Sequence, residues 1–309
     1  MAETRSLTAQ IPGRQLLKLG SAVPYALLAP AVLVLVIFVL YPVAYSVYLS
    51  LTDANLLRLA QVEFIGLENY QRLFSRDVFW ESLTNTLIYT VGSVVVSYLI
   101  GLMTALILNE DFRFRGLART LISIPWATPW LVVTLIWYVM FNPQIGPINQ
   151  VLKAIGVIDT GVPWLYQKQT AMIAIIGVTA WRLFPQATLI ILAGLQSISP
   201  DLYEAAKVDG ADGWQRFRYV TLPSIHTTNL VIIVLLTITS FKLFTIAWTL
   251  TQGGPGTATT VLSVYTYQEA FMSNRLGRAS ALSTISVLVS GILVIVYFIA
   301  IGREKPEKS

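Results

Sequence analysis

The feature that most constrains this chain is a set of long apolar runs without any charged side chain. Val23 to Leu51 and Leu83 to Asn109 are uncharged and longer than the roughly 20 residues that a helix needs to cross the hydrocarbon layer of a bilayer. Leu121 to Phe141 and Ala279 to Ile301 are uncharged as well. Charged residues make up 12% of the chain, against about 25% in soluble domains. The sequence therefore predicts an all-α integral membrane protein.

Two further apolar runs each contain one cation, Arg182 in Thr170 to Ile198 and Lys242 in Thr227 to Leu250. Their length and their Leu, Ile, Val and Ala content favour the same interpretation, so we expect six transmembrane helices within residues 23–302. The first span has an apolar core about twice as long as that of a signal peptide, and no small-x-small cleavage site follows it. We expect this span to remain in the mature protein.

The positive charges are distributed unevenly among the segments that connect the spans. Twelve Lys and Arg residues fall in segments 1–23, 109–119, 199–225 and 302–309, and seven fall in segments 52–82, 142–169 and 251–278. Loops rich in Lys and Arg stay in the cytoplasm, so we predict that the terminal tails, 1–22 and 303–309, are both cytoplasmic. The cations form no basic stripe, which argues against a nucleic-acid partner.

A polar, helix-forming segment interrupts the apolar pattern between the fourth and fifth spans. Ser199 is a suitable N-cap residue, and Pro200 suits the first turn of a helix. Glu204 places negative charge near the positive end of the helix dipole. Gly210 and Gly213 would end this helix and allow a second one to begin. We therefore expect a compact helix-turn-helix in this loop.

The same segment contains a specific motif. Residues Glu204 to Ala211 read EAAKVDGA, and Phe217, Leu222 and Pro223 follow at fixed spacing. This pattern resembles the EAA loop of the membrane subunits of binding-protein-dependent ABC importers. Three flanking segments match the same family: Asn85-Thr86-Leu87, Gly253-Gly254-Pro255 and Ala279-Ser280-Ala281. From about Pro24 onward, the chain is similar to the sugar-carrying branch, which includes maltose-type and glycerol-phosphate-type permeases.

The resemblance implies a type I ABC importer permease fold in which loop 199–223 is the coupling element and sits in a groove of the ATPase subunit. The resemblance implies that Glu204 makes a polar contact to the ATPase and that Asp209 and Gly210 fix the end of the helix. It also implies that the small side chains of Ala205, Ala206 and Ala211 allow the loop to approach the ATPase closely.

The resemblance also implies the partners and the location. These are a second homologous permease, two ATPase subunits and an extracytoplasmic substrate-binding protein, in the cytoplasmic (inner) membrane of a bacterium or archaeon. The segment Phe64 to Tyr70, FIGLENY, is similar to a family segment and is a candidate contact for the binding protein.

Several absences in the sequence limit the chemistry of this chain. The segment Gly253 to Gly256 lacks the Lys and Ser/Thr of a phosphate loop, so ATP and Mg would bind to the partner ATPases. The chain has no cysteine and one histidine, His226, which excludes thiol chemistry and a metal cluster. We therefore expect no cofactor on this chain and a transport function instead of an enzymatic one.

Prolines in the third and fourth spans predict interrupted helices. Pro125 and Pro129 lie within a few residues of each other in the third span, and Pro185 lies beside Arg182 in the fourth. Each proline removes one helix hydrogen bond, so we expect kinks or local unwinding there. Broken helices in membranes usually line a cavity, although prolines that only shape packing are the alternative.

The two intramembrane cations need partners, because a charged side chain in the bilayer centre is costly. The six apolar runs contain no Asp or Glu, so no ion pair between spans of this chain is available to Arg182 or Lys242. Three kinds of partner remain: backbone carbonyls near Pro185, a carboxylate of another subunit, and the substrate.

The permeases that this chain resembles bind their solute with residues of the spans before and after the EAA loop. The matching positions here are Trp181, Arg182, Gln186, Thr239, Ser240 and Lys242. An aromatic ring stacks on the C–H face of a sugar, and hydroxyl and amide groups bond its hydroxyls, although ordinary packing is the alternative for each residue. Maltose-type permeases tend to have neutral amides where this chain has Lys242, which puts a neutral maltodextrin in doubt. Lys242 either faces an anionic solute or pairs with the partner permease or water.

Two other functions are less consistent with the sequence. A secondary transporter driven by an ion gradient would need an intramembrane carboxylate or an inverted repeat, and neither is seen. An intramembrane enzyme would need a His with a Ser or Asp partner inside the spans, and only the peripheral His226 is present. The leading interpretation is the permease subunit of an ATP-driven sugar importer.

Overall fold

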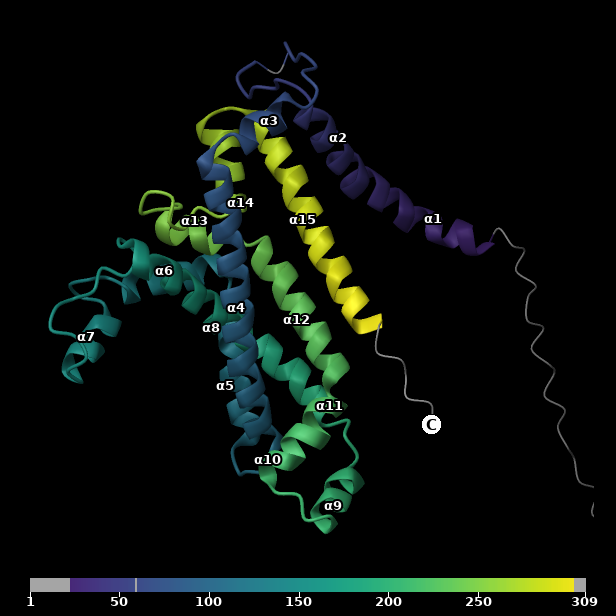
Figure 1. Cartoon of the computed structure of the whole chain (residues 1–309), viewed down its shortest axis with the longest axis vertical. Coiled ribbons are helices and arrows are strands. Elements are labelled where there is room, and N and C mark those ends of the chain that lie inside the picture. The colour runs from purple at the N-terminus through teal and green to yellow at the C-terminus, as the bar shows by residue number, and fades with distance from the viewer. Residues whose placement is uncertain (1–22, 59, 303–309) are drawn as a thin grey trace, which may run out of the picture. The chain divides into compact units, whose positions relative to one another are not determined.

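The computed structural model describes residues 23–58 and 60–302, and over these residues the chain is almost entirely helical (Figure 1). The predicted tails, 1–22 and 303–309, lie outside the described residues. The chain divides into two units, of which the first ends at Tyr45. This unit contains α1 (Val23–Leu35), η1 (Val36–Leu40) and the beginning of α2 (Tyr41–Ser50), and its large apolar side chains are exposed. A helix that is apolar on every side is typical of a membrane span.

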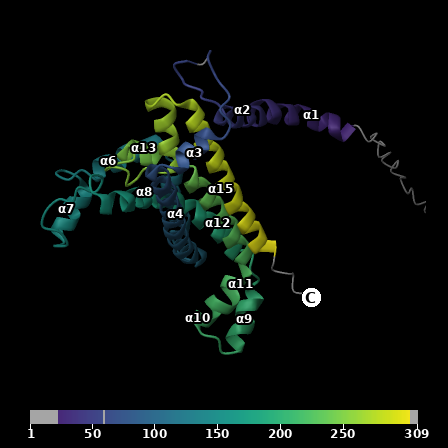
Figure 2. The ribbon, with the colours of Figure 1, turned by 45° about the horizontal axis from the view of Figure 1, so that its top comes forward.

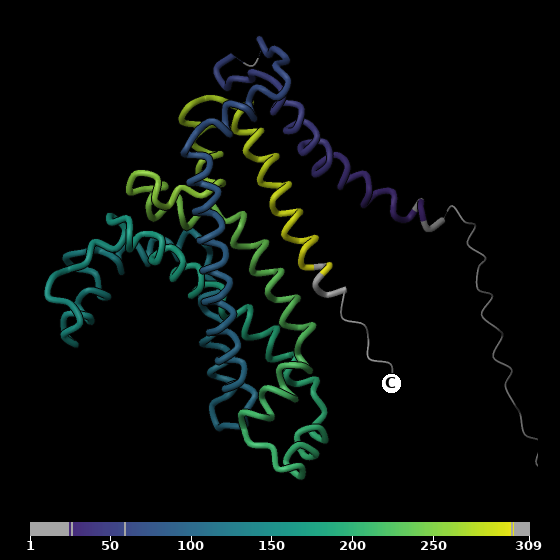
Figure 3. The backbone as a smooth tube through the Cα atoms, viewed as in Figure 1, coloured from purple at the N-terminus to yellow at the C-terminus, as the bar shows by residue number. Residues whose placement is uncertain are grey.

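The second unit is built around two long helices, α4 (Asp77–Asn109) and α8 (Lys168–Leu195), which pack along each other. α12 (His226–Phe241) packs against both of them, and α15 (Leu276–Gly302) packs against α12 (Figure 3). Gly101 allows the close approach of α4 and α8, because a Cβ atom at this position would lie 2.5 Å from Cβ of Ala187. Small residues at such crossings are usual where membrane helices associate.

Among the described residues, four helices are long and apolar enough to cross a membrane, and two bent pairs of helices bring the number to six if each pair is one span. The first pair is α5 (Arg115–Ala127) and α6 (Trp130–Met140), which meet at an angle of 95°. Pro129 is the N-cap residue of α6, so the predicted interruption of the third span is confirmed at this proline, whereas Pro125 lies inside α5.

The fourth span is not divided into two helices at Pro185, so the structure shows no local unwinding there. α8 continues through Pro185 as one helix of 28 residues. Proline removes the hydrogen bond to the carbonyl of Trp181, one turn back. The helix nevertheless continues, and α4, α5 and α12 all pack against it.

The fifth predicted span, Thr227 to Leu250, is also not a single helix. α12 ends at Phe241, Lys242 is its C-cap residue, and α13 (Thr245–Thr251) begins after a short break. The second bent pair leads into α12 from Gly213–Ser224 at an angle of 68°. A cation at a helix C-terminus interacts favourably with the helix dipole, so Lys242 is well suited to the position at which the helix ends.

Short elements complete the second unit. α3 (Glu68–Phe74) lies near the N-terminal end of α4, α7 (Pro147–Ala154) follows α6 and precedes α8 in the chain, and α14 (Leu262–Tyr267) and η3 (Gln268–Met272) lead into α15. The Asn69 side chain in α3 donates hydrogen bonds to the carbonyls of Ser50 and Thr52, at 2.9 and 2.7 Å. This asparagine of the FIGLENY segment is therefore buried and ties α3 to the chain before it.

A buried carboxylate joins three elements at the same end of the unit. Glu269 in η3 lies 3.2 Å from a guanidinium nitrogen of Arg76, 3.6 Å from Arg278 and 3.8 Å from Arg275. Arg76 precedes α4, Arg275 precedes α15 and Arg278 lies in its first turn. We call these four residues the Glu269 cluster; it holds the starts of α4 and α15 to η3.

Candidate functional site

The EAA segment forms a two-part helical hairpin. Its first helix, α9, spans Pro200–Val208, and the hydroxyl of Ser199 accepts a hydrogen bond from the backbone N–H of Asp201 at 3.3 Å. Asp209 is the C-cap residue, and Gly210 has φ of +79°, a left-handed conformation that disfavours other residues. The helix therefore ends where the sequence predicted.

The second part of the hairpin begins with a capping box. Asp212 accepts the backbone N–H of Gln215, and the Gln215 side chain accepts the N–H of Asp212, both at 2.8 Å. The helical segment continues as α10 (Gly213–Arg216), η2 (Phe217–Thr221) and α11 (Leu222–Ser224). The hydroxyls of Tyr203 and Thr221 lie 3.0 Å apart and connect the two parts. Caps and this cross-link give the hairpin a defined shape without a partner.

The hairpin lies at the end of the unit opposite α3, and it projects beyond α4 and α12 (Figures 1 and 2). Glu204, Ala205, Asp209 and Gly210 are exposed, whereas Ala206 and Ala211 are half-buried. Four large apolar side chains are also exposed on it: Leu202, Val208, Trp214 and Tyr219. Val208 and Tyr219 are 87% and 71% exposed, which is unusual for apolar side chains outside a membrane span. This mixture of exposed apolar and charged groups has the character of a docking surface.

The six predicted solute-contacting residues lie in two different environments. Trp181 packs in an aromatic cluster, with its ring centroid 5.5 Å from that of Trp137. The guanidinium of Arg182 lies over the ring of Trp130, 4.2 Å from its centroid. This cation–π contact is a fourth kind of partner for Arg182, which the sequence analysis did not consider. Gln186 is half-buried one turn further along α8.

The other three candidates lie at the end of α12. Thr239 is half-buried, and the hydroxyl of Ser240 is buried without a hydrogen-bond partner among the described residues. Lys242 is exposed and lines a groove of about 390 Å³ between α12, α14 and α15. The other lining residues are Ile238, Phe241, Leu262, Ser263, Thr266, Ser283, Ser286, Val287 and Ser290. We call this cavity the Lys242 groove.

The serines of α15 were missed by the sequence analysis. Ser283, Ser286 and Ser290 lie three and four residues apart, and such residues share one face of a helix. This spacing could have indicated a polar stripe on the last span. The structure places the stripe opposite Lys242, across the groove.

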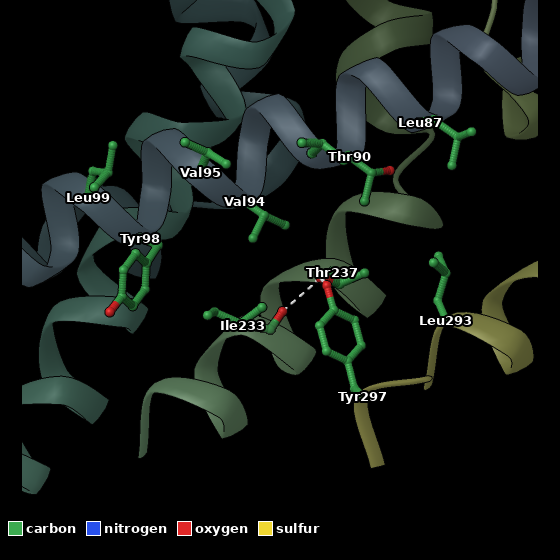
Figure 4. Close-up of a pocket in the computed structure, with 11 residues that line it drawn as sticks. Leu87, Thr90, Val94, Val95, Tyr98, Leu99, Ile233, Thr237, Leu293 and Tyr297 are labelled. Atoms are coloured by element: carbon green, nitrogen blue, oxygen red, sulfur yellow. Dashed lines mark hydrogen bonds between the residues drawn. The ribbon is translucent and has the colours of Figure 1, made fainter. Parts of the chain in front are cut away.

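A second cavity, of about 290 Å³, has different chemistry (Figure 4). It lies between α4, α12 and α15, and apolar side chains such as Val94 and Leu293 form most of its lining. Its hydrogen-bonding groups include Thr237 and Tyr297, whose hydroxyls are 3.1 Å apart. The cavity contains no charged side chain and few free polar groups, so it suits an apolar occupant better than a sugar.

The fold and the hairpin together define a polytopic membrane transport subunit. Residues 97–303 match the family model described as the binding-protein-dependent transport system inner membrane component, and the chain belongs to this family. It therefore has the type I ABC importer permease fold and is a transport component, not an enzyme. This membership does not favour the alternative of a secondary transporter.

Relatives match over nearly the whole chain. The trehalose/maltose transport system permease protein of Thermococcus litoralis is 36% identical over 302 residues, which cover 98% of this chain and 99% of that protein. The sulfoquinovosyl glycerol transport system permease protein of Agrobacterium fabrum is 38% identical over 271 residues, with 88% and 87% covered.

Solved structures agree with these sequence matches. A chain of a bacterial ABC transporter involved in the import of the acidic polysaccharide alginate superposes with a TM-score of 0.78 at 26% identity, covering 92% of this chain and 96% of that one. A chain of the alginate transporter in complex with an alginate pentasaccharide-bound periplasmic protein gives a TM-score of 0.75 at 26% identity, with 89% and 92% covered.

Proposed function

We propose that this chain is the permease subunit of an ATP-driven importer that moves a sugar or sugar derivative across the cytoplasmic membrane. The whole-length similarity to a trehalose/maltose permease carries the proposal. The names of other relatives include sulfoquinovosyl glycerol and an acidic polysaccharide, so they leave the particular sugar open.

We propose that the hairpin of residues 199–223 couples this chain to an ATPase subunit. The exposed Glu204 would be the main polar contact, and the small side chains of Ala205, Ala206 and Ala211 would let α9 approach the ATPase groove closely. Asp209 and Gly210 would fix the end of the helix. The exposed apolar side chains on the same hairpin support this assignment, because a partner would remove them from water.

The complete importer would contain this chain, a second homologous permease, two ATPase subunits that bind ATP and Mg, and an extracytoplasmic binding protein. The solved complex of a related transporter with its periplasmic protein supports the last of these. Nucleic acid is not among the proposed partners. The charge distribution supports an orientation with both termini and the hairpin in the cytoplasm.

The proposed cycle uses the hairpin as the moving part. When the ATPase dimer closes around ATP, the hairpins of the two permeases approach each other, and the pathway opens outward to receive the solute from the binding protein. After hydrolysis the dimer separates, and the pathway opens inward. Trp181, Gln186, Thr239 and Ser240 are the neutral residues proposed to contact the solute, beside Arg182 and Lys242.

The reversal of charge at Glu204 tests the coupling. In the assembled importer, Glu204→Lys should lower sugar uptake at least tenfold and reduce the amount of ATPase that copurifies in detergent. The physical reason is that a cation replaces the exposed carboxylate at the proposed ATPase contact in the middle of α9. Membrane insertion, measured as protein in the membrane fraction, should stay at the wild-type level.

Asp159→Lys is the matched control, because Asp159 is an exposed carboxylate in the loop between α7 and α8, far from the hairpin in the sequence. This variant should retain the ATPase. Wild-type uptake and ATPase retention in Glu204→Lys would refute the coupling role. Absence of uptake for every sugar by the wild-type importer would refute the sugar assignment.

A further inference from the structure

We propose that the Lys242 groove forms part of the solute pathway and binds the anionic group of a sugar acid, such as a carboxylate, sulfonate or phosphate. This inference rests on the proposed transport function and narrows its substrate class. It depends on the position of Lys242 along α12, on the partners of Lys242 and on the hydrogen bonds that the lining hydroxyls form.

Lys242 lies at the end of α12 that is remote from the hairpin. α12 has 16 residues and ends directly before Lys242. At a rise of about 1.5 Å per residue, this lysine lies about 24 Å from the start of α12, which is most of a hydrocarbon layer of about 30 Å. In the proposed orientation, with the hairpin in the cytoplasm, the ammonium therefore lies on the side from which the binding protein would deliver the solute.

The described part of the chain provides no anionic partner for this ammonium. Lys242 forms no ion pair there, and no carboxylate lines the groove. Glu269, the acid that follows α14, is occupied by the three arginines of its cluster. The other intramembrane cation, Arg182, has the ring of Trp130. Lys242 thus has neither a carboxylate nor an aromatic ring as a partner among the described residues, and an external anion would supply the missing counter-charge.

The hydroxyls in the groove are prepared to accept hydrogen bonds. Ser286 donates its proton to the carbonyl of Leu282 at 2.8 Å, and Thr266 donates to Leu262 at 2.8 Å. Ser290 and Ser263 likewise donate to backbone carbonyls, at 3.0 and 3.3 Å. Because their protons are used, these oxygens face the groove as acceptors, which suits the hydroxyl groups of a sugar.

The groove therefore combines one strong cationic donor with several acceptors. A polyhydroxylated solute with one anionic group complements both, because its oxyanion meets the ammonium and its hydroxyls donate to the serines and the threonine. A neutral sugar would satisfy the acceptors and leave the ammonium without a counter-charge. The volume of about 390 Å³ is in the range of a small-molecule site.

The test uses the complete importer with its binding protein in proteoliposomes and four probes: trehalose, glucuronate, sulfoquinovosyl glycerol and glucose 6-phosphate. The wild type should take up at least one anionic probe. Lys242→Met should lower that uptake at least tenfold, and Lys242→Arg should keep it within about threefold. Ser286→Ala should lower it several-fold, because one acceptor is lost. Thr284→Val is the matched control, since Thr284 bonds its own helix backbone in the same way and does not line the groove.

Melting temperature of the complex, measured in parallel, separates binding from assembly. Equal melting temperatures for the wild type and Lys242→Met, together with lost anion uptake, support the proposal. The proposal would be overturned if the wild type takes up only trehalose and Lys242→Met lowers the melting temperature. This result would indicate that Lys242 pairs with a group of the partner permease. Uptake of the anionic probe by Lys242→Met at the wild-type level would also overturn the proposal. If the wild type takes up no sugar, the proposed function itself fails.

Discussion

Gly101→Ala should destabilise the protein because it places a methyl group where α4 and α8 touch. The new Cβ would lie 2.5 Å from Cβ of Ala187 and 3.2 Å from the carbonyl oxygen of Phe184. Carbon atoms prefer separations of about 3.5–4.0 Å, so the helices must part locally by about 1 Å. Overpacking costs about 1–3 kcal/mol, and replacing a helical glycine by alanine returns about 0.5–1 kcal/mol. We expect a net loss of about 1–2 kcal/mol in the free energy of unfolding.

The assay is equilibrium unfolding of the purified chain in mixed micelles, followed by circular dichroism. Gly177→Ala is the control, because Gly177 lies in α8 and its added Cβ meets no atom within 4 Å. This control should be neutral or slightly stabilising. In the double variant Gly101→Ala with Ala187→Gly, the collision disappears, so the two changes should be coupled by at least about 0.5 kcal/mol. Wild-type stability of Gly101→Ala, or additive effects in the double variant, would refute the close contact.

Two further outcomes follow from the Glu269 cluster and from the aromatic cluster. Glu269→Gln should lower stability by about 1–3 kcal/mol, a value reduced from that of a fully buried pair because two of the arginines are partly exposed. Glu68→Gln removes a pair whose side chains are about half exposed and should change stability by less than about 1 kcal/mol; equal effects of the two variants would contradict the difference in burial. Trp181→Ala should lower sugar uptake at least tenfold while the ATPase still copurifies, and Trp181→Phe should recover part of it. Unchanged uptake in Trp181→Ala would remove this residue from the solute pathway.

The sequence was most informative where a single local rule decides the structure. Absence of charge over long runs predicted the membrane class and the six spans, and the family match and the fold confirm this class. Both ends of α9 were predicted from Ser199 and Gly210, because capping depends on neighbouring residues alone. The roles of the hairpin residues and the solute contacts remain predictions.

Long-range packing explains what the sequence could not indicate. Pro129 lies at a break between two helices and Pro185 lies inside one, although both are prolines within apolar runs of the sequence. The break after Phe241 carries neither proline nor glycine, so no local signal marks it. Likewise, the stacking of Arg182 on Trp130 joins two helices that are far apart in the sequence.

The capped hairpin has a mechanical consequence. Its two parts are tied to each other by the Tyr203–Thr221 contact, and each part has its own end cap, so a push on α9 moves the hairpin as one body and does not unwind it. That body continues through the 68° bend directly into α12, whose far end carries Lys242. A displacement of the hairpin would thus be transmitted along α12 to the wall of the Lys242 groove.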